Sequence, residues 1–387
     1  MNGGLKTFMD SQEQVKDSEP ALEVKNLRVV FKTYAGVVKA LDGIDLTVHK
    51  GEVLGIVGES GCGKSVTALA IAGLLPENAE ILSGQVLLGG QDLLKKSKKE
   101  IRIARLRDIA LVFQDPMTYL NPVMSIGSQI TEIFTGNLKV YGEELTNSRI
   151  AVIAKLLSAE SDSTKIADLE HEKLRLQAIK PGKLSKSEAK RLARLRAIEY
   201  LKLVRLPNPE RIFKMYPFEL SGGMRQRAMI AMALVRRPKV LLADEITTAL
   251  DVTVQAQILK LLKELRDKID SSIILITHDL GVVAETCDRV AVMYAGNIVE
   301  VADVFEMFQN PLHPYTVGLF AAVPKPDISL DELESIKGSV PNLIYPPSGC
   351  RFHPRCSRAF EKCPAMKPKM IEANPNHYVA CLLYGGS

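Results

Sequence analysis

The sequence predicts an α/β fold with a helical subdomain and a small cysteine-rich C-terminal module. The segment EVLGIVGESGCGKSVTALAIAGLL has the pattern of a buried strand, a glycine-rich turn and a helix. Much later, KVLLADE and SSIILITHD have the continuous apolar runs of buried parallel strands, and the helical run VTVQAQILKLLKELRDKI lies between them. We therefore expect both halves of the chain to contribute to one sheet.

Length and composition exclude several classes of protein. The chain has 387 residues, enough for two or three domains, and 46% hydrophobic with 25% charged residues exclude a mainly disordered or collagen-like chain. The net charge of +5 is too small to establish a nucleic-acid or membrane partner. No apolar run approaches the roughly 18 residues of a membrane span, and none near the N-terminus fits a signal peptide. We expect a cytosolic chain that does not itself cross a membrane.

The chain divides into segments of different character. Residues 1–20 are polar, and we expect them to be mobile. Residues 21–303 should form the main domain, which begins with the alternating strands LEVKNLRVVF and VKALDGIDLTV. Within it, residues 121–217 have helical periodicity and many charges, which predicts a helical subdomain. Residues 304–387 are rich in proline and cysteine and predict a loop-rich module, so we expect all strands of the main sheet to precede Asp303.

Residues 58–65, GESGCGKS, match the pattern G-x-x-x-x-G-K-[ST] and lie between a predicted strand and a predicted helix. Glycines in such a loop let backbone N–H groups converge on a polyphosphate at the helix N-terminus. Lys64 would supply a charge to the β and γ phosphates, and the Ser65 hydroxyl would ligate Mg²⁺. The candidate nucleotide-binding residues of the loop are Gly58, Ser60, Gly61, Cys62, Gly63, Lys64 and Ser65.

The strand VLLADE would deliver two acids to its carboxyl end, where ligands of open α/β sheets bind. Asp244 is the candidate Mg²⁺ carboxylate, and Glu245 is the candidate general base for an attacking water. Adjacent acids are common at strand ends, so this pair is informative because it accompanies GESGCGKS.

Three further motifs occur in order around these two: FQDP at 113–116, LSGGMRQR at 220–227 and LITHD at 275–279. Over roughly residues 21–300 the set resembles the Q-loop, signature sequence and H-loop of ABC-type ATPases. The phrases QDPMTYLNP, ELSGGMRQRAMIAMAL, TTALDVTVQAQIL and PLHPYT are similar to those of the ATP-binding subunits of oligopeptide and dipeptide importers.

The resemblance implies a head-to-tail pair of ATPase subunits with two ATP molecules between them. Ser221, Gly222 and Gly223 would then contact the γ-phosphate held by the other subunit. Gln114 would reach Mg²⁺ and the attacking water, and Asp251 would communicate across the dimer. The candidate Mg²⁺ ligands are therefore Ser65, Gln114 and Asp244.

Two other positions complete the implied site. His278 would contact the γ-phosphate and hold the geometry around Glu245, so the candidate catalytic residues are Glu245, His278 and Gln114. An aromatic side chain near the start of the domain should stack on adenine. Tyr34 is the candidate, and Phe31 is the alternative.

The resemblance also implies partners and a location. The chain would be the ATP-hydrolysing subunit of a di- or oligopeptide importer, peripheral on the cytoplasmic face of the cell membrane. Its direct partners would be two transmembrane permease subunits and a second ABC ATPase subunit, which would be a paralogue or else an identical chain. An extracytoplasmic substrate-binding protein would act through the permease. No nucleic-acid partner is expected. Oligosaccharides or nickel are alternative cargoes. A soluble ABC ATPase acting on ribosomes or DNA is the alternative class, but those proteins usually fuse two ATPase domains or carry a long coiled coil.

The sequence departs from the family pattern at two places. Ile246 stands where the family usually has a proline after its acidic strand, and residues 139–180 look like an insertion. The segment Lys180–Arg196 is strongly basic, which would suit lipid headgroups or RNA. We favour a solvated helix face, because no aromatic residues are interleaved there for base stacking.

Four of the six cysteines lie near the C-terminus: Cys350, Cys356, Cys363 and Cys381. In a cytosolic protein such a group indicates a metal site more than disulfides, and thiolates can hold Zn²⁺ or a [4Fe–4S] cluster. Some members of the importer subfamily that this chain resembles bind [4Fe–4S], so we rank that cluster first, zinc second and reduced cysteines third. Disulfides stay open as an alternative.

Overall fold

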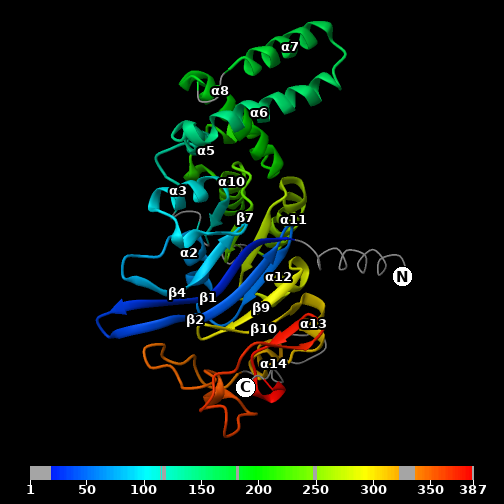
Figure 1. Cartoon of the computed structure of the whole chain (residues 1–387). Coiled ribbons are helices and arrows are strands. Elements are labelled where there is room, and N and C mark those ends of the chain that lie inside the picture. Colours follow the sequence, from blue (N-terminus) through cyan, green and yellow to red (C-terminus); the bar gives the residue numbers. More distant parts are fainter. Residues whose placement is uncertain are drawn as a thin grey trace, which may run out of the picture. The chain divides into compact units, whose positions relative to one another are not determined.

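The computed structural model describes residues 19–113, 115, 119–179, 183–246, 251–321 and 336–385, with the side chain of Asp267 left out (Figure 1). Nearly all of the polar segment 1–20, together with Gln114, lies outside these residues. The chain forms two compact units. Unit 1 comprises Met1–Leu111, Lys239–Ile246 and Leu262–Ser387, and unit 2 comprises Val112–Pro238 and Thr247–Leu261.

A four-stranded antiparallel sheet opens unit 1, with the strand order β2-β1-β4-β5. Its first two strands pair from Pro20 with His49 to the turn between Thr33 and Gly36, and Leu22, Val24, Leu27 and Val29 of the first strand are buried. This matches the alternation seen in the sequence. The strands are β1 (Pro20–Thr33), β2 (Gly36–His49), β4 (Ala79–Leu88) and β5 (Gln91–Asp92).

The second sheet has eight strands in the order β11-β12-β10-β9-β3-β8-β7-β6. β3 pairs in parallel with both β8 and β9, and β7 pairs in parallel with β8. The prediction that both halves of the chain share one sheet is therefore confirmed. The strands are β3 (Val53–Val57), β6 (Ile109–Val112), β7 (Val240–Asp244), β8 (Ser272–Ile276), β9 (Arg289–Tyr294), β10 (Asn297–Asp303), β11 (Ile371–Asn374) and β12 (His377–Val379).

This sheet does not end at Asp303, so the expectation that all its strands precede that residue is wrong. β12 pairs antiparallel with β10, with Glu300 opposite Val379, and β11 pairs with β12. The physical reason is that β10 would otherwise leave a row of unpaired backbone groups, and the C-terminal segment covers them. Three residues of β12 are too few to show a strand pattern in the sequence.

Helices and short turns complete unit 1. The helices are α2 (Lys64–Ala72), α3 (Lys98–Arg107), α12 (Leu280–Thr286), α13 (Val304–Gln309) and α14 (Pro314–Ala321), with α11 (Val252–Ile269) divided between the units. The 3₁₀ turns are η1 (Leu93–Lys95), η4 (His353–Arg355) and η5 (Leu382–Tyr384). Most of residues 336–385 is loop, as the proline and cysteine content predicts.

Unit 2 is helical over most of its described residues. It contains α5 (Ile126–Thr135), α6 (Leu138–Leu157), α7 (Ser163–Gln177), α8 (Lys186–Leu203), α9 (Pro209–Ile212), η2 (Pro217–Glu219) and α10 (Gly222–Leu234). The apparent insertion at 139–180 forms most of α6 and all of α7, which pack side by side (Figure 1). Arg149 joins them through two bonds of 3.0 and 2.7 Å to Glu172, and this guanidinium helps lower the pKa of Glu172 to about 2.

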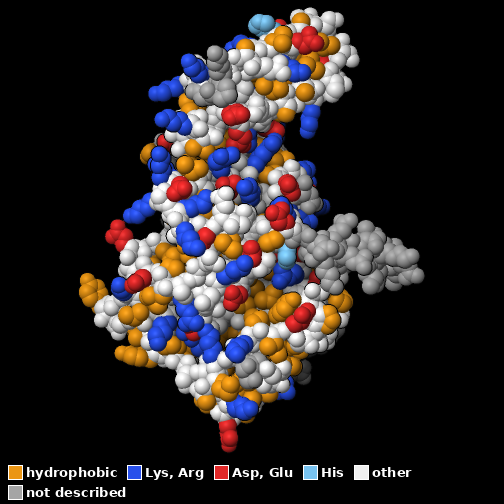
Figure 2. Space-filling model, in the orientation of Figure 1, with side chains coloured by type: hydrophobic (Ala, Val, Ile, Leu, Met, Phe, Trp, Pro, Cys, Tyr) orange, Lys and Arg blue, Asp and Glu red, His pale blue; other side chains and the backbone are white. Residues whose placement is uncertain are grey.

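The basic residues before and in α8 have different environments. Lys186, Lys190 and Arg194 are exposed, as a solvated helix face requires. Arg196 is buried instead, where it donates to the Val235 carbonyl at 2.8 Å. On the face shown in Figure 2, Lys and Arg side chains are interleaved with Asp and Glu side chains. Among the described residues, no helix combines the length and the apolar character needed to cross a membrane.

Candidate functional site

The glycine-rich loop lies between the carboxyl end of β3 and the start of α2. Gly58 has φ 152°, and a Cβ there would lie 2.1 Å from the Met293 carbonyl oxygen. Gly63 caps α2 with φ 110°, and its Cβ would lie 2.8 Å from Met293 Cε. Both positions therefore need glycine, and the loop they shape brings the N-terminus of α2 to the site. The partial positive charge of that helix end attracts phosphate.

Lys64 points back into the loop. Its side chain is buried, and its Nζ donates to the carbonyl oxygens of Gly58 at 2.7 Å and Glu59 at 3.1 Å. Cys62 is also buried, and burial raises the pKa of its thiol, so it serves as an apolar wall of the loop. The ammonium is thus held inside the loop, against its backbone carbonyls. Phosphate oxygens would replace the two carbonyls as its acceptors.

The two acids lie at the same edge of the sheet as this loop, because β3, β7 and β8 are parallel. One oxygen of Asp244, Oδ1, is buried and has no hydrogen-bond partner among the described residues. Burial raises the pKa of Asp244, and a hydrogen bond from Ser65 opposes that shift. A hydroxyl and a carboxylate are the hard oxygen ligands that Mg²⁺ prefers, so Ser65 and Asp244 fit this cation. Gln114, the third candidate ligand, lies outside the described residues.

Glu245 and His278 face each other across neighbouring strand ends. His278 Nδ1 lies 3.3 Å from Glu245 Oε1, and the Glu245 amide donates to the Ile276 carbonyl at 2.9 Å. The backbone of Glu245 is left-handed, with φ 49°. The side chain of Glu245 is 22% exposed and that of His278 is 55% exposed, so both can meet a water and a bound phosphate.

The signature residues belong to unit 2. Ser221 is the N-cap of α10 and accepts a hydrogen bond from the Met224 amide at 3.4 Å, and Gly222 and Gly223 open the helix. A Cβ at Gly223 would lie 2.7 Å from Val254 Cγ1, so glycine permits the close packing of α11. Asp251 precedes α11 and accepts from the Val254 amide at 2.9 Å, which makes it a helix cap in this structure.

The two aromatic candidates for adenine stacking differ in exposure. Tyr34 lies at the tip of the β1–β2 hairpin and is fully exposed, whereas Phe31 lies within β1 and packs against the hydrophobic core. Exposure favours Tyr34, because a stacking ring must be accessible to the base.

Sequence reasoning missed three contacts with the phosphate loop, two of which come from the C-terminal segment. The Glu59 amide donates to the Tyr315 hydroxyl at 2.9 Å, and Arg355 makes two bonds to the Glu59 carboxylate. The Gly296 amide, which follows β9, donates to the Cys62 carbonyl at 2.7 Å. No local pattern signals these contacts, since Arg355 lies 296 residues from Glu59.

The four C-terminal cysteines line one small cavity of about 10 Å³. All four are free thiols, and burial raises the pKa of Cys350 to about 11, with the other three cysteines adding to the shift. Their convergence agrees with their clustering in the sequence. However, among the described residues no three His, Cys, Asp or Glu groups are arranged closely enough to hold a metal ion. Four thiols are nevertheless a donor set that suits Zn²⁺ or an iron–sulfur cluster.

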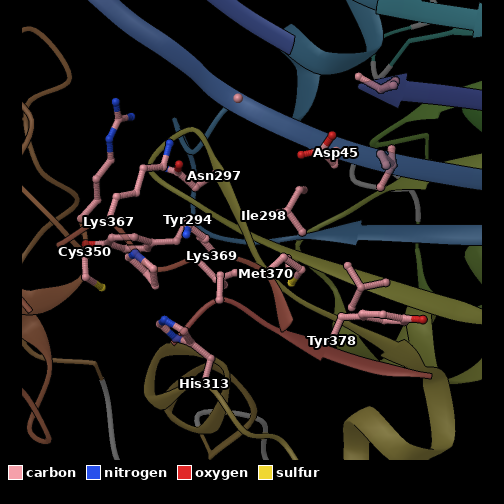
Figure 3. A pocket seen from close by; sticks show the side chains of 18 of the residues that line it. Asp45, Tyr294, Asn297, Ile298, His313, Cys350, Lys367, Lys369, Met370 and Tyr378 are labelled. Atoms are coloured by element: carbon pink, nitrogen blue, oxygen red, sulfur yellow. The ribbon is translucent and has the colours of Figure 1, made fainter. Parts of the chain in front are cut away.

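A groove of about 890 Å³ lies apart from the phosphate loop, between β2, β10 and the C-terminal segment. Figure 3 shows Lys367 and Lys369 near one part of it, with Ile298, Met370 and Tyr378 along another. Three cations near the groove share one carboxylate, that of Asp42: Arg28 at 2.6 Å, Arg351 at 3.3 Å and Lys367 at 2.8 Å. The candidate nucleotide-binding residues do not line this groove.

The model of the ABC transporter family matches residues 41–248, more than half of the chain. The chain belongs to this family. A second model, the C-terminal region of oligopeptide/dipeptide transporters, matches residues 299–363. That match covers most of β10, the 3₁₀ turn η4 and three of the four clustered cysteines.

Relatives in the ABC transporter family extend over nearly the whole chain. The dipeptide transport ATP-binding protein DppD of Bacillus subtilis is 43% identical over 94% of this chain and 95% of its own length. The oligopeptide transport ATP-binding protein OppD of the same organism is 46% identical over 92% and 87%. OppD of Salmonella typhimurium is 42% identical over 96% and 97%.

Solved structures support the same fold. The cbiO1 protein of Clostridium perfringens, part of the ABC transporter complex cbiONQ, matches with a TM-score of 0.53 and 26% identity over 76% of this chain and 92% of its own. The dimeric ATP-binding cassette MJ0796, bound to ADP and Pi, matches with a TM-score of 0.53 and 24% identity over 73% and 98%. The second likeness shows the fold alone.

Proposed function

We propose that this ABC transporter subunit hydrolyses ATP to drive an importer of dipeptides or oligopeptides. The observation that carries the proposal is the meeting of Lys64, Asp244, Glu245 and His278 at one edge of the sheet. The peptide cargo is supported by the C-terminal match and by the names of the relatives. Oligosaccharides and nickel stay the alternative cargoes.

Each group at the sheet edge has a distinct task in the proposed reaction. The loop amides and Lys64 bind the β and γ phosphates, and Ser65 and Asp244 hold Mg²⁺. When bound, this cation neutralises phosphate charge. Glu245 accepts the proton of the attacking water, and His278, 3.3 Å away, keeps the carboxylate oriented toward it. Tyr34 stacks on the adenine ring.

The proposed assembly is a head-to-tail pair of ATPase subunits, which the resemblance of the five motifs to those of ABC-type ATPases implies. Ser221, Gly222, Gly223 and Asp251 would then act at the ATP of the other subunit. The residues after Gln114 and the helical subdomain 121–217 would receive two permease subunits on the cytoplasmic face of the membrane. The permease would in turn receive an extracytoplasmic substrate-binding protein.

We also propose that residues 304–387 form a module whose four cysteines hold a [4Fe–4S] cluster, with zinc as the alternative. Convergence of the thiols on one cavity supports the proposal, and bound metal would deprotonate them, although burial raises the pKa of Cys350, Cys356 and Cys381. Anaerobic purification with metal analysis should give about four irons per chain and a broad visible absorbance. If the protein instead contains one zinc per chain and is colourless, the site is a Zn²⁺ site. If it contains no metal and all four thiols can be alkylated, the proposal of a metal site is refuted.

The experiment that tests the chemistry is Glu245→Gln in the assembled transporter. The variant keeps the shape of the side chain and loses the proton acceptor, so hydrolysis should fall about 10²-fold or more with ATP affinity nearly unchanged. Glu77→Gln, at an exposed position of the same unit, is the matched control and should hydrolyse ATP normally. Hydrolysis retained in Glu245→Gln would refute the assignment. The cargo is decided by comparing how fast the same transporter takes up labelled peptides, labelled sugars and nickel.

A further inference from the structure

Glu59, the second residue of the phosphate loop, is held at all three of its polar groups. Its amide donates to the Tyr315 hydroxyl at 2.9 Å, and its carbonyl accepts from Lys64 Nζ at 3.1 Å. Its carboxylate accepts two bonds from Arg355, at 2.7 and 3.0 Å. Two of these three restraints come from the C-terminal part of the chain, so that part determines where this stretch of the loop lies.

Arg355 is fixed by more than its ion pair. Its side chain is 6% exposed and donates to the carbonyl oxygens of Lys337 at 3.0 Å and Gly338 at 3.2 Å. The guanidinium lies over the Tyr294 ring at 5.7 Å and the Phe352 ring at 6.0 Å. A planar, two-pronged donor with this many partners has little freedom, so it restricts the Glu59 carboxylate to one position.

The backbone around Arg355 is set by the turn that carries two of the clustered cysteines. The His353 amide donates to the Cys350 carbonyl at 3.0 Å, the Arg355 amide to the Phe352 carbonyl at 2.9 Å, and the Cys356 amide to the His353 carbonyl at 3.3 Å. Arg355 is thus the last residue of η4, and Cys356 follows it directly. A change in the positions of Cys350 and Cys356 would move Arg355.

We propose that Arg355 is a positioning residue of the ATP site, through which the turn between Cys350 and Cys356 sets the affinity for ATP. Arg355 neutralises a carboxylate that lies in the phosphate loop and would otherwise repel a triphosphate. The inference rests on the proposed ATP site, and it is independent of the peptide cargo and of whether the cysteines hold a metal.

Three variants of the full chain separate this role from simple structural support. Arg355→Ala leaves the Glu59 carboxylate unpaired, and its dissociation constant for ATP, measured by titration with a fluorescent ATP analogue, should rise about tenfold. Glu59→Gln alone should change the dissociation constant for ATP little, because the positive charge of Arg355 that remains favours phosphate. The double variant should regain most of the lost affinity, because the repelling charge is gone.

The kinetic signature follows from the same argument. Arg355→Ala should raise KM for ATP and leave kcat within about twofold, since Glu245 and His278 are untouched. Arg355→Lys, which can reach Glu59 with one donor only, should fall between wild type and alanine. Arg102→Ala, at an exposed arginine on α3, is the control and should bind ATP normally. Should the double variant bind as weakly as Arg355→Ala, the electrostatic role would be overturned.

A second measurement tests the link to the cysteine turn. Cys356→Pro, which removes the amide that donates to the His353 carbonyl, should weaken ATP binding in the wild-type background and have little further effect in the Glu59→Gln/Arg355→Ala background, because the ion pair that it displaces is already absent there. Equal losses in both backgrounds would overturn the link. Circular dichroism and thermal unfolding identify any variant that does not fold, and the conservative Arg355→Lys keeps the inference testable in that event. A transporter that binds ATP as expected but carries no peptide would refute the cargo and not this inference.

Discussion

A buried pair attaches the C-terminal strands to the main sheet. His377 of β12 and Glu300 of β10 are both 0% exposed, and His377 Nε2 lies 2.7 Å from Glu300 Oε1. Glu300 also accepts hydrogen bonds from the backbone amides of Leu312 at 2.7 Å and His313 at 2.9 Å. The other ring nitrogen of His377 lies 3.3 Å from Glu306. Loss of the ring would therefore leave a buried carboxylate with two donors in place of three.

His377→Ala should destabilise the attachment by about 3–5 kcal/mol, the usual cost of removing one partner from a buried ion pair. His377→Gln, which can still donate one hydrogen bond, should lose less. Because a chain of two units need not unfold in one step, the measurement is hydrogen exchange of the backbone amides in residues 371–385. His171→Ala, at an exposed histidine of α7, is the control. A loss below about 1 kcal/mol would refute the reasoning.

The same pair gives a pH dependence with a definite sign. Burial lowers the pKa of His377, but Glu300 and Glu306 outweigh burial, and the net pKa is raised. The folded state therefore prefers the protonated ring, so its stabilisation is complete below the unfolded pKa of about 6.5 and is lost as the pH rises through the raised value. Exchange protection of residues 371–385, corrected for intrinsic rates, should fall as the pH rises above the unfolded pKa of about 6.5 and become flat in His377→Gln. Protection that rises with pH would contradict this.

Three further predictions concern other parts of the molecule. Lys64→Ala should weaken ATP binding by about tenfold or more, because the substitution removes a charge that contacts phosphate before the reaction. Glu245→Gln should leave ATP binding nearly unchanged, and titration with nucleotide measures both affinities. Asp115→Lys should uncouple hydrolysis from transport in reconstituted vesicles, whereas a parallel fall in both activities would count against the docking surface. Cys381→Ser should make residues 336–385 sensitive to protease, and unchanged cleavage would show that the four cysteines do not hold this segment together.

The core of the site could be predicted because its information is local in the sequence. GESGCGKS carries the turn, the helix start and the lysine within eight residues, and VLLADE carries a buried strand with its two acids. Parallel strands place such segments at one sheet edge, so the approach of Glu245 and His278 follows from the fold class. The convergence of the four cysteines was likewise readable from their clustering.

The contacts of the C-terminal segment could not be predicted in the same way. β12 has three residues, too few for an alternating pattern, and its pairing depends on the uncovered edge of β10. Arg355 and Glu59 are both ordinary charged residues in loops, and only the folded chain brings them together. The basic run before and in α8 misled for a related reason, since Arg196 serves as a buried partner and not as part of a solvated face.

The departure at Ile246 has a physical consequence at Glu245, the candidate general base. A proline there would restrict the preceding residue to extended backbone, whereas Glu245 has φ 49°. A left-handed conformation costs a residue with a side chain about 1–2 kcal/mol. Burial of Ile246, which is 2% exposed, contributes about 1.5–3 kcal/mol in the opposite direction, and the bond from the Glu245 amide to Ile276 adds to it. In this chain, therefore, a buried apolar side chain and not a proline follows Glu245, and this residue keeps the left-handed backbone that a following proline would disfavour.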